Sequence, residues 1–268
     1  MTIAHISDLH VRRKGDLLHH MIHTGRELRR AVAVLNAASP RPAFVVATGD
    51  LVERGKPKEY KRLRAILADL ALPVFLVPGN HDDRASLRAA FPHHTYLPRS
   101  GPLCYAVETR PLRMIALDTT TGRRGRGGEV DAERLAWLDR TLAAAPHVPT
   151  VIAMHHPPFD VGVAPVDTPP LAGRDDFARV VAAHAHVVRI LCGHVHRFHG
   201  ATVGGAPAFS VPSTAQQLVV EAADARPYRV RLEPPAVALH RWNGSAVVTG
   251  LVRTAETERL PPRSIMVA

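Results

Sequence analysis

The first 77 residues alternate strand and helix patterns, and this alternation limits the fold more than any other feature. Two stretches have helical spacing of apolar residues, 27–38 and 57–70, and the second carries Pro57 in its first turn. Short apolar runs typical of buried strands lie before, between and after them, at 3–6, 43–47 and 73–77. This order predicts a parallel sheet with right-handed crossovers.

The remaining sequence predicts further elements and one long loop. A hairpin is expected at 103–117, helices at 131–143 and 175–185, and strands at 150–154 and 187–191. The Pro- and Gly-rich stretch 157–173 is unusually long for a loop, and such loops often form lids or substrate walls. Residues 200–252 are mostly β in pattern. We expect one domain over residues 1–260, and a tail at 261–268.

Composition narrows the classes of partner. The chain has 268 residues and is 46% hydrophobic, which is enough for a full core. Its 34 Lys and Arg against 24 Asp and Glu give a net charge of +10, so the surface should attract anions. Phosphorylated small molecules fit this charge. Nucleic acid is possible but less favoured, because the sequence has no Lys/Arg block and no basic stripe interleaved with aromatic residues.

The cysteine and apolar patterns argue against a disulfide framework, a cysteine metal site and a membrane span. Cys104 and Cys192 are far apart in strand-like runs, which argues against a disulfide framework and against a cysteine metal site. No apolar run is long enough to span a membrane. A signal peptide is not expected, because a core strand begins at Ile3 and polar residues follow it at once. We therefore expect a cytoplasmic protein, and the sequence leaves open whether it forms a homo-oligomer.

Polar residues follow five of the predicted strands. The carboxyl ends of parallel strands lie side by side, so these residues should meet in one cleft. Asp, Asn and His without Cys suit Mn, Fe, Co or Zn, whereas Mg and Ca prefer all-oxygen sites. The set is too large for one ion, and a carboxylate such as Asp50 can bridge two ions about 3.5–4 Å apart. The residues are Asp8 and His10, Asp50, Asn80 to Asp82, His155 and His156, and His194 and His196.

Each motif is weak by itself. Asp-x-His is usually a turn, Gly-Asp before a helix is commonly a loop and cap, and Gly79 is expected to serve only as a turn. It is their order, each at a strand end, that predicts a two-metal site. The other histidines outside the last ligand loop are expected on the surface or in packing: His5, His19, His20, His23, His93, His94, His147, His184, His186 and His240.

The ordered motifs D-x-H, GD, GNHD, HH and GHVH resemble the calcineurin-like metallophosphoesterase superfamily. The stretches Ile-Ser-Asp-Leu-His at 6–10 and Cys-Gly-His-Val-His at 192–196 are similar to the bacterial branch of class III cyclic-nucleotide phosphodiesterases and glycerophosphodiesterases. The resemblance implies an α/β fold, a four-layer αββα sandwich of two mixed β-sheets flanked by helices.

The resemblance also implies a ligand set. One metal would be held by Asp8, His10, Asp50 and His196, and the other by Asp50, Asn80, His155 and His194. His155 is favoured over His156 because it directly follows the strand and matches the family position. His81 would steady the phosphoryl oxygens or protonate the departing alkoxide, with Asp82 orienting it. Asn80, His81, His156 and His199 are expected as substrate contacts.

The implied function is hydrolysis of small phosphodiesters by a hydroxide that bridges the two metals. The alternatives are a broad phosphomonoesterase, a nuclease, or a non-enzymatic metal-bearing scaffold. A scaffold should have lost ligands, and this chain has lost none. Gln216 and Gln217 stand where glycerophosphodiesterases can carry a His, which leaves cyclic nucleotides or other small diesters open. The loop at 118–128 could present Arg123, Arg124 and Arg126 to anionic substituents.

Overall fold

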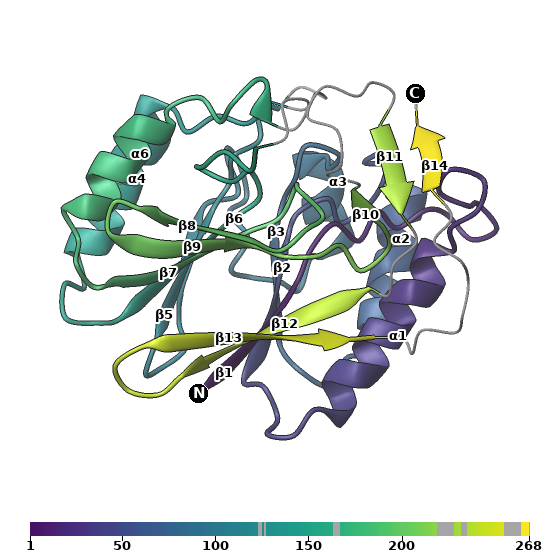
Figure 1. Cartoon of the computed structure of the whole chain (residues 1–268), viewed down its shortest axis with the longest axis horizontal. Coiled ribbons are helices and arrows are strands. Elements are labelled where there is room, and N and C mark those ends of the chain that lie inside the picture. The colour runs from purple at the N-terminus through teal and green to yellow at the C-terminus, as the bar shows by residue number, and fades with distance from the viewer. Residues whose placement is uncertain are drawn as a thin grey trace.

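The computed structural model describes residues 1–122, 125, 127–162, 167–218, 228–231, 235–254 and 264–267. Two β-sheets lie between two groups of helices (Figure 1). This arrangement confirms the predicted αββα sandwich of two mixed sheets. Arg123, Arg124 and Arg126 of the predicted basic loop lie outside the described residues.

The first sheet has five strands and contains the parallel sheet that the first 77 residues predict. β1 (Thr2–Ile6) pairs in parallel with β2 (Phe44–Thr48), and β2 pairs in parallel with β3 (Val74–Val77). Two later strands extend the other edge in antiparallel pairing, β12 (Ala236–Trp242) on β1 and then β13 (Val247–Arg253). Two strands from late in the chain therefore complete the sheet that begins with β1.

The second sheet has six strands in the order β4-β5-β6-β7-β9-β8. The four central strands are parallel, and the outer strands β4 and β8 are antiparallel to their neighbours. Their bounds are β4 (Tyr105–Glu108), β5 (Arg113–Leu117), β6 (Thr150–Met154), β7 (Val187–Cys192), β8 (His199–Val203) and β9 (Ala206–Ser210). A small third sheet joins β10 (Gln217–Leu218), β11 (Tyr228–Arg231) and β14 (Ser264–Val267). β14 falls within the predicted tail.

Helices cover the outer face of each sheet (Figure 1). α1 (Thr24–Ala37), α2 (Pro57–Leu67) and α3 (Arg84–Ala90) lie together on the first sheet, and α4 (Ala132–Ala143) and α6 (Arg174–Ala182) on the second. Their start signals are local: Pro57 opens α2, and the carboxylates of Asp83 and Asp131 accept hydrogen bonds from backbone N–H groups in the first turns of α3 and α4. None of these helices is both long and apolar enough to span a bilayer.

The main core lies between the two sheets. Buried apolar side chains from β1, β2 and β3 form one cluster with residues of β5, β6 and β7, including Ile6, Val46 and Leu191. Burial of this apolar surface stabilises the sandwich by about 25 cal/mol per Å². Because the core fixes one sheet against the other, it also fixes the distance between their strand ends.

Candidate metal centre

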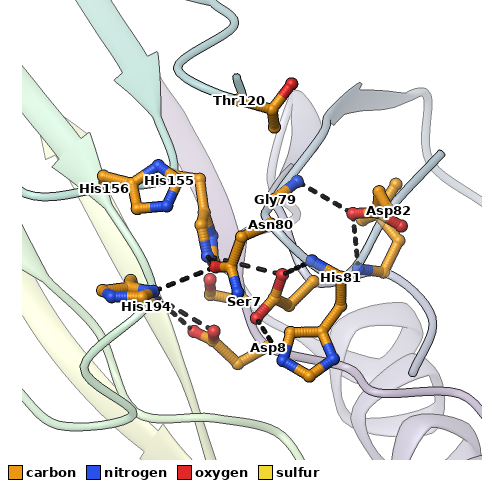
Figure 2. Close-up of polar contacts among 12 residues, drawn as sticks. Ser7, Asp8, Gly79, Asn80, His81, Asp82, Thr120, His155, His156 and His194 are labelled. Carbon is orange, nitrogen blue, oxygen red and sulfur yellow. Dashed lines mark hydrogen bonds and ion pairs between the residues drawn. The ribbon is translucent and has the colours of Figure 1, made fainter. Parts of the chain in front are cut away.

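The predicted polar segments converge from both sheets. Asp8, Asp50 and Asn80 follow β1, β2 and β3 of the first sheet, and His155 and His194 follow β6 and β7 of the second. In Figure 2 the side chains of Asp8, Asn80, His155 and His194 point toward one another. The carboxyl ends of the two sets of parallel strands thus meet face to face at one end of the sandwich.

The first group consists of Asp8, His10, Asp50 and His196. Each offers one ligand atom, and these four atoms lie within 4.8 Å of one another. His10 Nε2 is 3.1 Å from His196 Nε2, and His196 Nε2 is 3.3 Å from Asp8 Oδ1. All four residues are buried. Metal bonds of about 2.0–2.2 Å place neighbouring ligand atoms about 3.0–3.4 Å apart, so this donor set fits one divalent ion.

The second group shares Asp50 with the first. His155 Nε2 lies 3.0 Å from Asn80 Oδ1 and 3.5 Å from Asp50 Oδ1. His194 Nδ1 lies 3.1 Å from Asn80 Oδ1. The other oxygen of Asp50, Oδ2, lies 3.7 Å from His10 Nε2 in the first group. The Asp50 carboxylate therefore faces both groups, as a bridging ligand must.

Three of these histidines have their second ring nitrogen fixed by an acceptor. His10 Nδ1 donates to Glu53 Oε2 (2.8 Å), His155 Nδ1 to the Thr48 carbonyl (2.7 Å) and His196 Nδ1 to the Gln216 carbonyl (3.2 Å). In the neutral ring, donation from Nδ1 sets the tautomer and leaves the Nε2 lone pair to bind a metal. The rings are thus oriented for ligation by hydrogen bonds within the protein.

The backbone at the site is strained. Five of the seven predicted ligands have positive φ: Asp8 (53°), His10 (43°), Asp50 (48°), His194 (71°) and His196 (56°). Non-glycine residues in this region cost of order 1 kcal/mol or more each and persist where the surrounding structure holds them. The strain is concentrated on the residues that face the two groups, which is typical of a functional site.

Gly79 and Gly193 allow the strand-end loops to approach one another. A Cβ on Gly79 would overlap the backbone N and Oδ1 of Asp50, and a Cβ on Gly193 would overlap Ser7 Oγ. Gly79 is not among the glycines with positive φ. Gly79 does begin a turn, closed by donation from Asp82 N–H to the Gly79 carbonyl (3.0 Å), and the position also requires the absence of a side chain next to Asp50.

The structure corrects the prediction that Asp82 orients the His81 imidazole. Its carboxylate accepts hydrogen bonds from the backbone N–H groups of Leu51 (3.0 Å) and Gly79 (2.8 Å) and from the Tyr60 hydroxyl (2.9 Å). Asp82 thus joins the loops after β2 and β3 instead of orienting the His81 imidazole. Burial and the charge of Asp50 raise the pKa of Asp82 to about 6, against the effect of these hydrogen bonds.

Glu53 fills the place that Asp82 was predicted to take. His81 Nδ1 donates to the Glu53 carbonyl (2.8 Å), while the Glu53 carboxylate holds His10. His81 Nε2 then lies 3.9 Å from Asp50 Oδ2, and the side chain is 34% exposed, far more than the predicted ligands beside it. Sequence reasoning missed Glu53, although an acidic residue three positions after Asp50 in the same loop was a signal for it.

The remaining predicted substrate contacts lie in different places. His156 is buried, with its Nδ1 at 2.7 Å from Thr119 Oγ1 and its ring centroid 4.7 Å from that of His194. One ligand atom each of His155, His156 and His194 lie within 4.8 Å of one another, so His156 is also within reach of a metal held by the second group. His199 begins β8, where its backbone N–H donates to Ser210 Oγ, and within the described ranges no contact joins it to the predicted ligands.

Without metal, the carboxylates and the imidazoles of the site shift one another's pKa values, and each favours the charged form of the other. Burial opposes ionisation of Asp8, but His196 and His155 lower its pKa to about 2. Burial likewise opposes ionisation of Asp50, and His155 and His81 hold its pKa well below the usual range. Burial lowers the pKa of His10, but Glu53 and Asp50 raise it to about 9. The pKa of His155 rises to about 9, because Asp50 and Asp8 outweigh burial.

These pKa values predict a pH-dependent metal affinity. His10 and His155 carry protons below about pH 9 in the metal-free protein, and ligation must displace them. We expect the affinity for Mn²⁺ to rise as the pH increases from 6.5 to about 9. Metal binding at neutral pH should release about two protons, measurable by calorimetry in buffers of different ionisation enthalpy.

The variant Glu53→Gln should release about one proton fewer on metal binding, since Glu53 raises the pKa of His10. A pH-independent affinity would contradict this account.

Comparison with known proteins identifies the family. The family model described as calcineurin-like phosphoesterase matches residues 1–198. The chain belongs to this family. This match confirms the family resemblance that the strand-end motifs indicated.

Its relatives include two named phosphodiesterases. The glycerophosphodiester phosphodiesterase of Enterobacter lignolyticus is 33% identical over 253 residues, which cover 93% of this phosphoesterase and 90% of the relative. The cAMP/cGMP dual specificity phosphodiesterase of Mycobacterium tuberculosis is 33% identical over 230 residues, or 84% and 71% of the two chains. A dimetal phosphatase from Danio rerio shares the fold, with a TM-score of 0.69 and 17% identity over 100% of this chain and 99% of that one.

Proposed function

We propose that this protein is a metal-dependent phosphodiesterase that hydrolyses small phosphodiesters. The observation that carries the proposal is the pair of ligand groups that share Asp50, with the exposed His81 imidazole beside them. Asp8, His10, Asp50 and His196 would hold one ion, and Asp50, Asn80, His155 and His194 the other. When bound, two divalent ions would lower the pKa of water and stabilise charge on the phosphoryl oxygens. Mn, Fe, Co and Zn suit this donor set.

The charge of the site favours a diester over a monoester. Glu53 adds a third carboxylate to those of Asp8 and Asp50, and the His10 imidazole lowers its pKa despite burial. Two divalent ions against these three carboxylates and the bridging hydroxide would leave the centre about neutral, so it could not compensate a second negative charge on the substrate. A phosphodiester carries one negative charge at neutral pH, whereas a phosphomonoester carries nearly two. The relatives named as phosphodiesterases support the same choice.

His81 is the side chain best placed to act on the substrate. Its Nδ1–H is held by the Glu53 carbonyl, so in the neutral tautomer Nε2 is the free nitrogen. Nε2 can contact a phosphoryl oxygen when the ring is protonated, or give a proton to the departing alkoxide. Its backbone N–H donates to Asp50 Oδ1 (2.9 Å) and fixes the position of the ring relative to the shared ligand.

The proposal is tested by comparing substrates on the metal-loaded protein. We expect bis(p-nitrophenyl) phosphate to be hydrolysed with a higher kcat/KM than p-nitrophenyl phosphate. Cyclic AMP and glycerophosphocholine test the two diester classes that the relatives' names specify, and single-stranded DNA tests the nuclease alternative. Faster turnover of the monoester would overturn the proposal, and absence of turnover on every substrate would favour a scaffold.

Variants of Asn80 and His81 should separate ligation from catalysis. Asn80→Ala removes the oxygen that lies between His155 and His194, so we expect it to weaken binding of one metal. His81→Ala should retain both metals and lower kcat by about 10²- to 10⁴-fold, as expected for loss of an acid or base. Metal content and rate measured on the same preparations check both expectations. Loss of metal in His81→Ala would contradict the role proposed for His81.

A further inference from the structure

The loop that follows β5 is held in place by buried polar contacts. Asp118 is fully buried, and its carboxylate accepts a hydrogen bond from Arg84 Nε (2.6 Å). The buried Arg134 guanidinium donates to the carbonyls of Asp118 (2.9 Å) and Thr120 (3.1 Å). These contacts fix both neighbours of Thr119, which is itself fully buried. The surrounding structure therefore sets the position of the Thr119 side chain.

Among the described residues, the hydroxyl group of Thr119 forms hydrogen bonds to His156 alone. Its Oγ1 accepts from the His156 backbone N–H (3.3 Å) and lies 2.7 Å from the ring nitrogen Nδ1. A buried hydroxyl that donates no hydrogen bond is unfavourable, so its one hydrogen needs an acceptor. In the described part of the chain that acceptor is His156 Nδ1. The Thr119 O–H therefore donates to Nδ1.

This hydrogen bond sets which nitrogen of His156 carries the hydrogen. Because Nδ1 accepts, the hydrogen of the neutral ring lies on Nε2. His10, His155 and His196 have the opposite arrangement, since their Nδ1 atoms donate and Nε2 keeps the lone pair. One ring nitrogen of His156 is within reach of a metal held by the second group. Its Nε2–H, however, is a hydrogen-bond donor and not a metal ligand.

The His156 ring packs closely against the histidines of the second ligand group. Its centroid is 4.8 Å from that of His155 and 4.7 Å from that of His194. Gly128 leaves room for the ring, since a Cβ on Gly128 would lie 2.4 Å from His156 Nδ1. The ring is therefore confined between the Thr119 loop, Gly128 and the neighbouring imidazoles.

A pocket lies beside His156 and the second ligand group. Both His156 and His194 line it, together with apolar side chains such as Phe159 of the predicted 157–173 loop. Apolar walls strengthen hydrogen bonds that form within a pocket. In Figure 2, Asn80 lies between His156 and His81. The two imidazoles outside the proposed ligand set thus stand on opposite sides of the site.

We propose that Thr119 is a positioning residue that fixes His156 as an Nε2–H donor to a phosphoryl oxygen of the diester. His156 contacts the substrate from the side of His194, and His81 contacts it from the side of His10. The phosphoryl oxygens carry the negative charge of a diester, and hydrogen bonds to charged acceptors are the stronger ones. This inference rests on the proposed phosphodiesterase function, because it adds a substrate contact to the same site.

Nuclear magnetic resonance can read the tautomer without any turnover. Long-range ¹H–¹⁵N correlation spectra of the Zn²⁺-loaded protein distinguish Nε2–H from Nδ1–H rings, and the His156 signals are those lost in His156→Ala. We expect the Nε2–H pattern in the wild type and in Thr119→Ser. Thr119→Val removes the donor to Nδ1, so the two nitrogen shifts should move toward each other as the second tautomer becomes populated. A wild-type ring with its hydrogen on Nδ1, hydrogens on both nitrogens or metal on Nε2 would overturn the assignment. An unchanged pattern in Thr119→Val would do so too.

Kinetics of the same variants test the contact with the substrate. We expect His156→Ala to lower kcat/KM for diesters by about 10- to 100-fold with metal content retained, as for loss of a hydrogen bond to a charged group. Thr119→Val should cost about fivefold and Thr119→Ser about twofold or less. Because Thr119 acts through His156, Thr119→Val should cost nothing further in the His156→Ala protein.

Two substrates that differ in leaving group identify the atom that His156 contacts. Ethyl p-nitrophenyl phosphate and ethyl phenyl phosphate share the phosphoryl oxygens, but phenolate is the poorer leaving group. A phosphoryl contact predicts the same fold-loss on both esters in His156→Ala. A much larger loss on the phenyl ester would mean that His156 protonates the leaving group, and would overturn the proposed contact.

Thr120→Val is the matched control for Thr119→Val. Thr120 is the next residue of the loop and is also buried, but its hydroxyl donates to Asp118 Oδ1 (2.8 Å) and not to His156. Its loss should lower the Tm while the His156 tautomer and kcat/KM stay near those of the wild type. An equal fall of kcat/KM in the two valine variants would mean that loop packing carries the effect, and would overturn the role of Thr119.

The outcomes separate this inference from the proposed function. Diester turnover that is unchanged in His156→Ala would overturn the inference alone. Metal loss in His156→Ala would place His156 among the ligands and would also overturn it. Absence of turnover on every diester by the wild-type protein would instead overturn the proposed function, and the phosphoryl contact with it.

Discussion

Asp50→Asn is expected to lower the hydrolysis rate of bis(p-nitrophenyl) phosphate by about 10³-fold or more, since several kcal/mol of charge stabilisation depend on the metal pair. One carboxylate oxygen of Asp50 faces His10 and the other faces His155, so its neutral amide should weaken both ligand groups at once. Metal content by elemental analysis should fall together with the rate.

Asp83→Asn is the control for this variant. Asp83 lies in the loop after β3 and caps α3 by accepting from Ser86 N–H, a role that asparagine performs about equally well. It should retain metal and activity. If Asp50→Asn kept both metals and most of its activity, the shared-ligand arrangement would be wrong.

Gly79→Ala is expected to damage the site through a single methyl group. The added Cβ would overlap Asp50 at its backbone N and at Oδ1, and would lie 2.9 Å from a ring carbon of His155. Relief of this overlap must move the shared ligand, and displacement by about 1 Å can cost about 10²-fold in rate. The crowding should also lower the free energy of unfolding by about 1–3 kcal/mol.

Gly250→Ala tests whether that loss is specific to position 79. Gly250 lies in β13 with open space where its Cβ would be, and its φ is not in the left-handed region. We expect the free energy of unfolding and the rate to stay near those of the wild type. Wild-type activity in Gly79→Ala would show that the strand-end loops tolerate a side chain between them.

Local sequence was sufficient for most of the elements and for the residue types of the site. Buried strands and amphipathic helices follow from apolar periodicity, and observed ends differ from the predicted ones by a few residues, as for the helix predicted at 57–70 and found at Pro57–Leu67. The short strands β10 and β14 were not predicted, because pairing with distant partners and not apolar periodicity defines them.

Contacts within the site depended on loop paths that local sequence does not specify. Asp82 and Glu53 are both acidic residues near the predicted ligands. Only the folded chain shows that Asp82 joins two loops through backbone N–H groups, while Glu53 holds the rings of His10 and His81.

The sequence by itself determined which donors could bind metal, because Asp, Asn and His follow strands that end at one edge of a sheet. Only the tertiary structure decided that those donors come from two sheets facing one another, so that Asp50 of one meets His155 of the other. The physical reason is that burial of apolar surface between the sheets sets their spacing. Glycines at the strand ends then let the loops close to ligand distance.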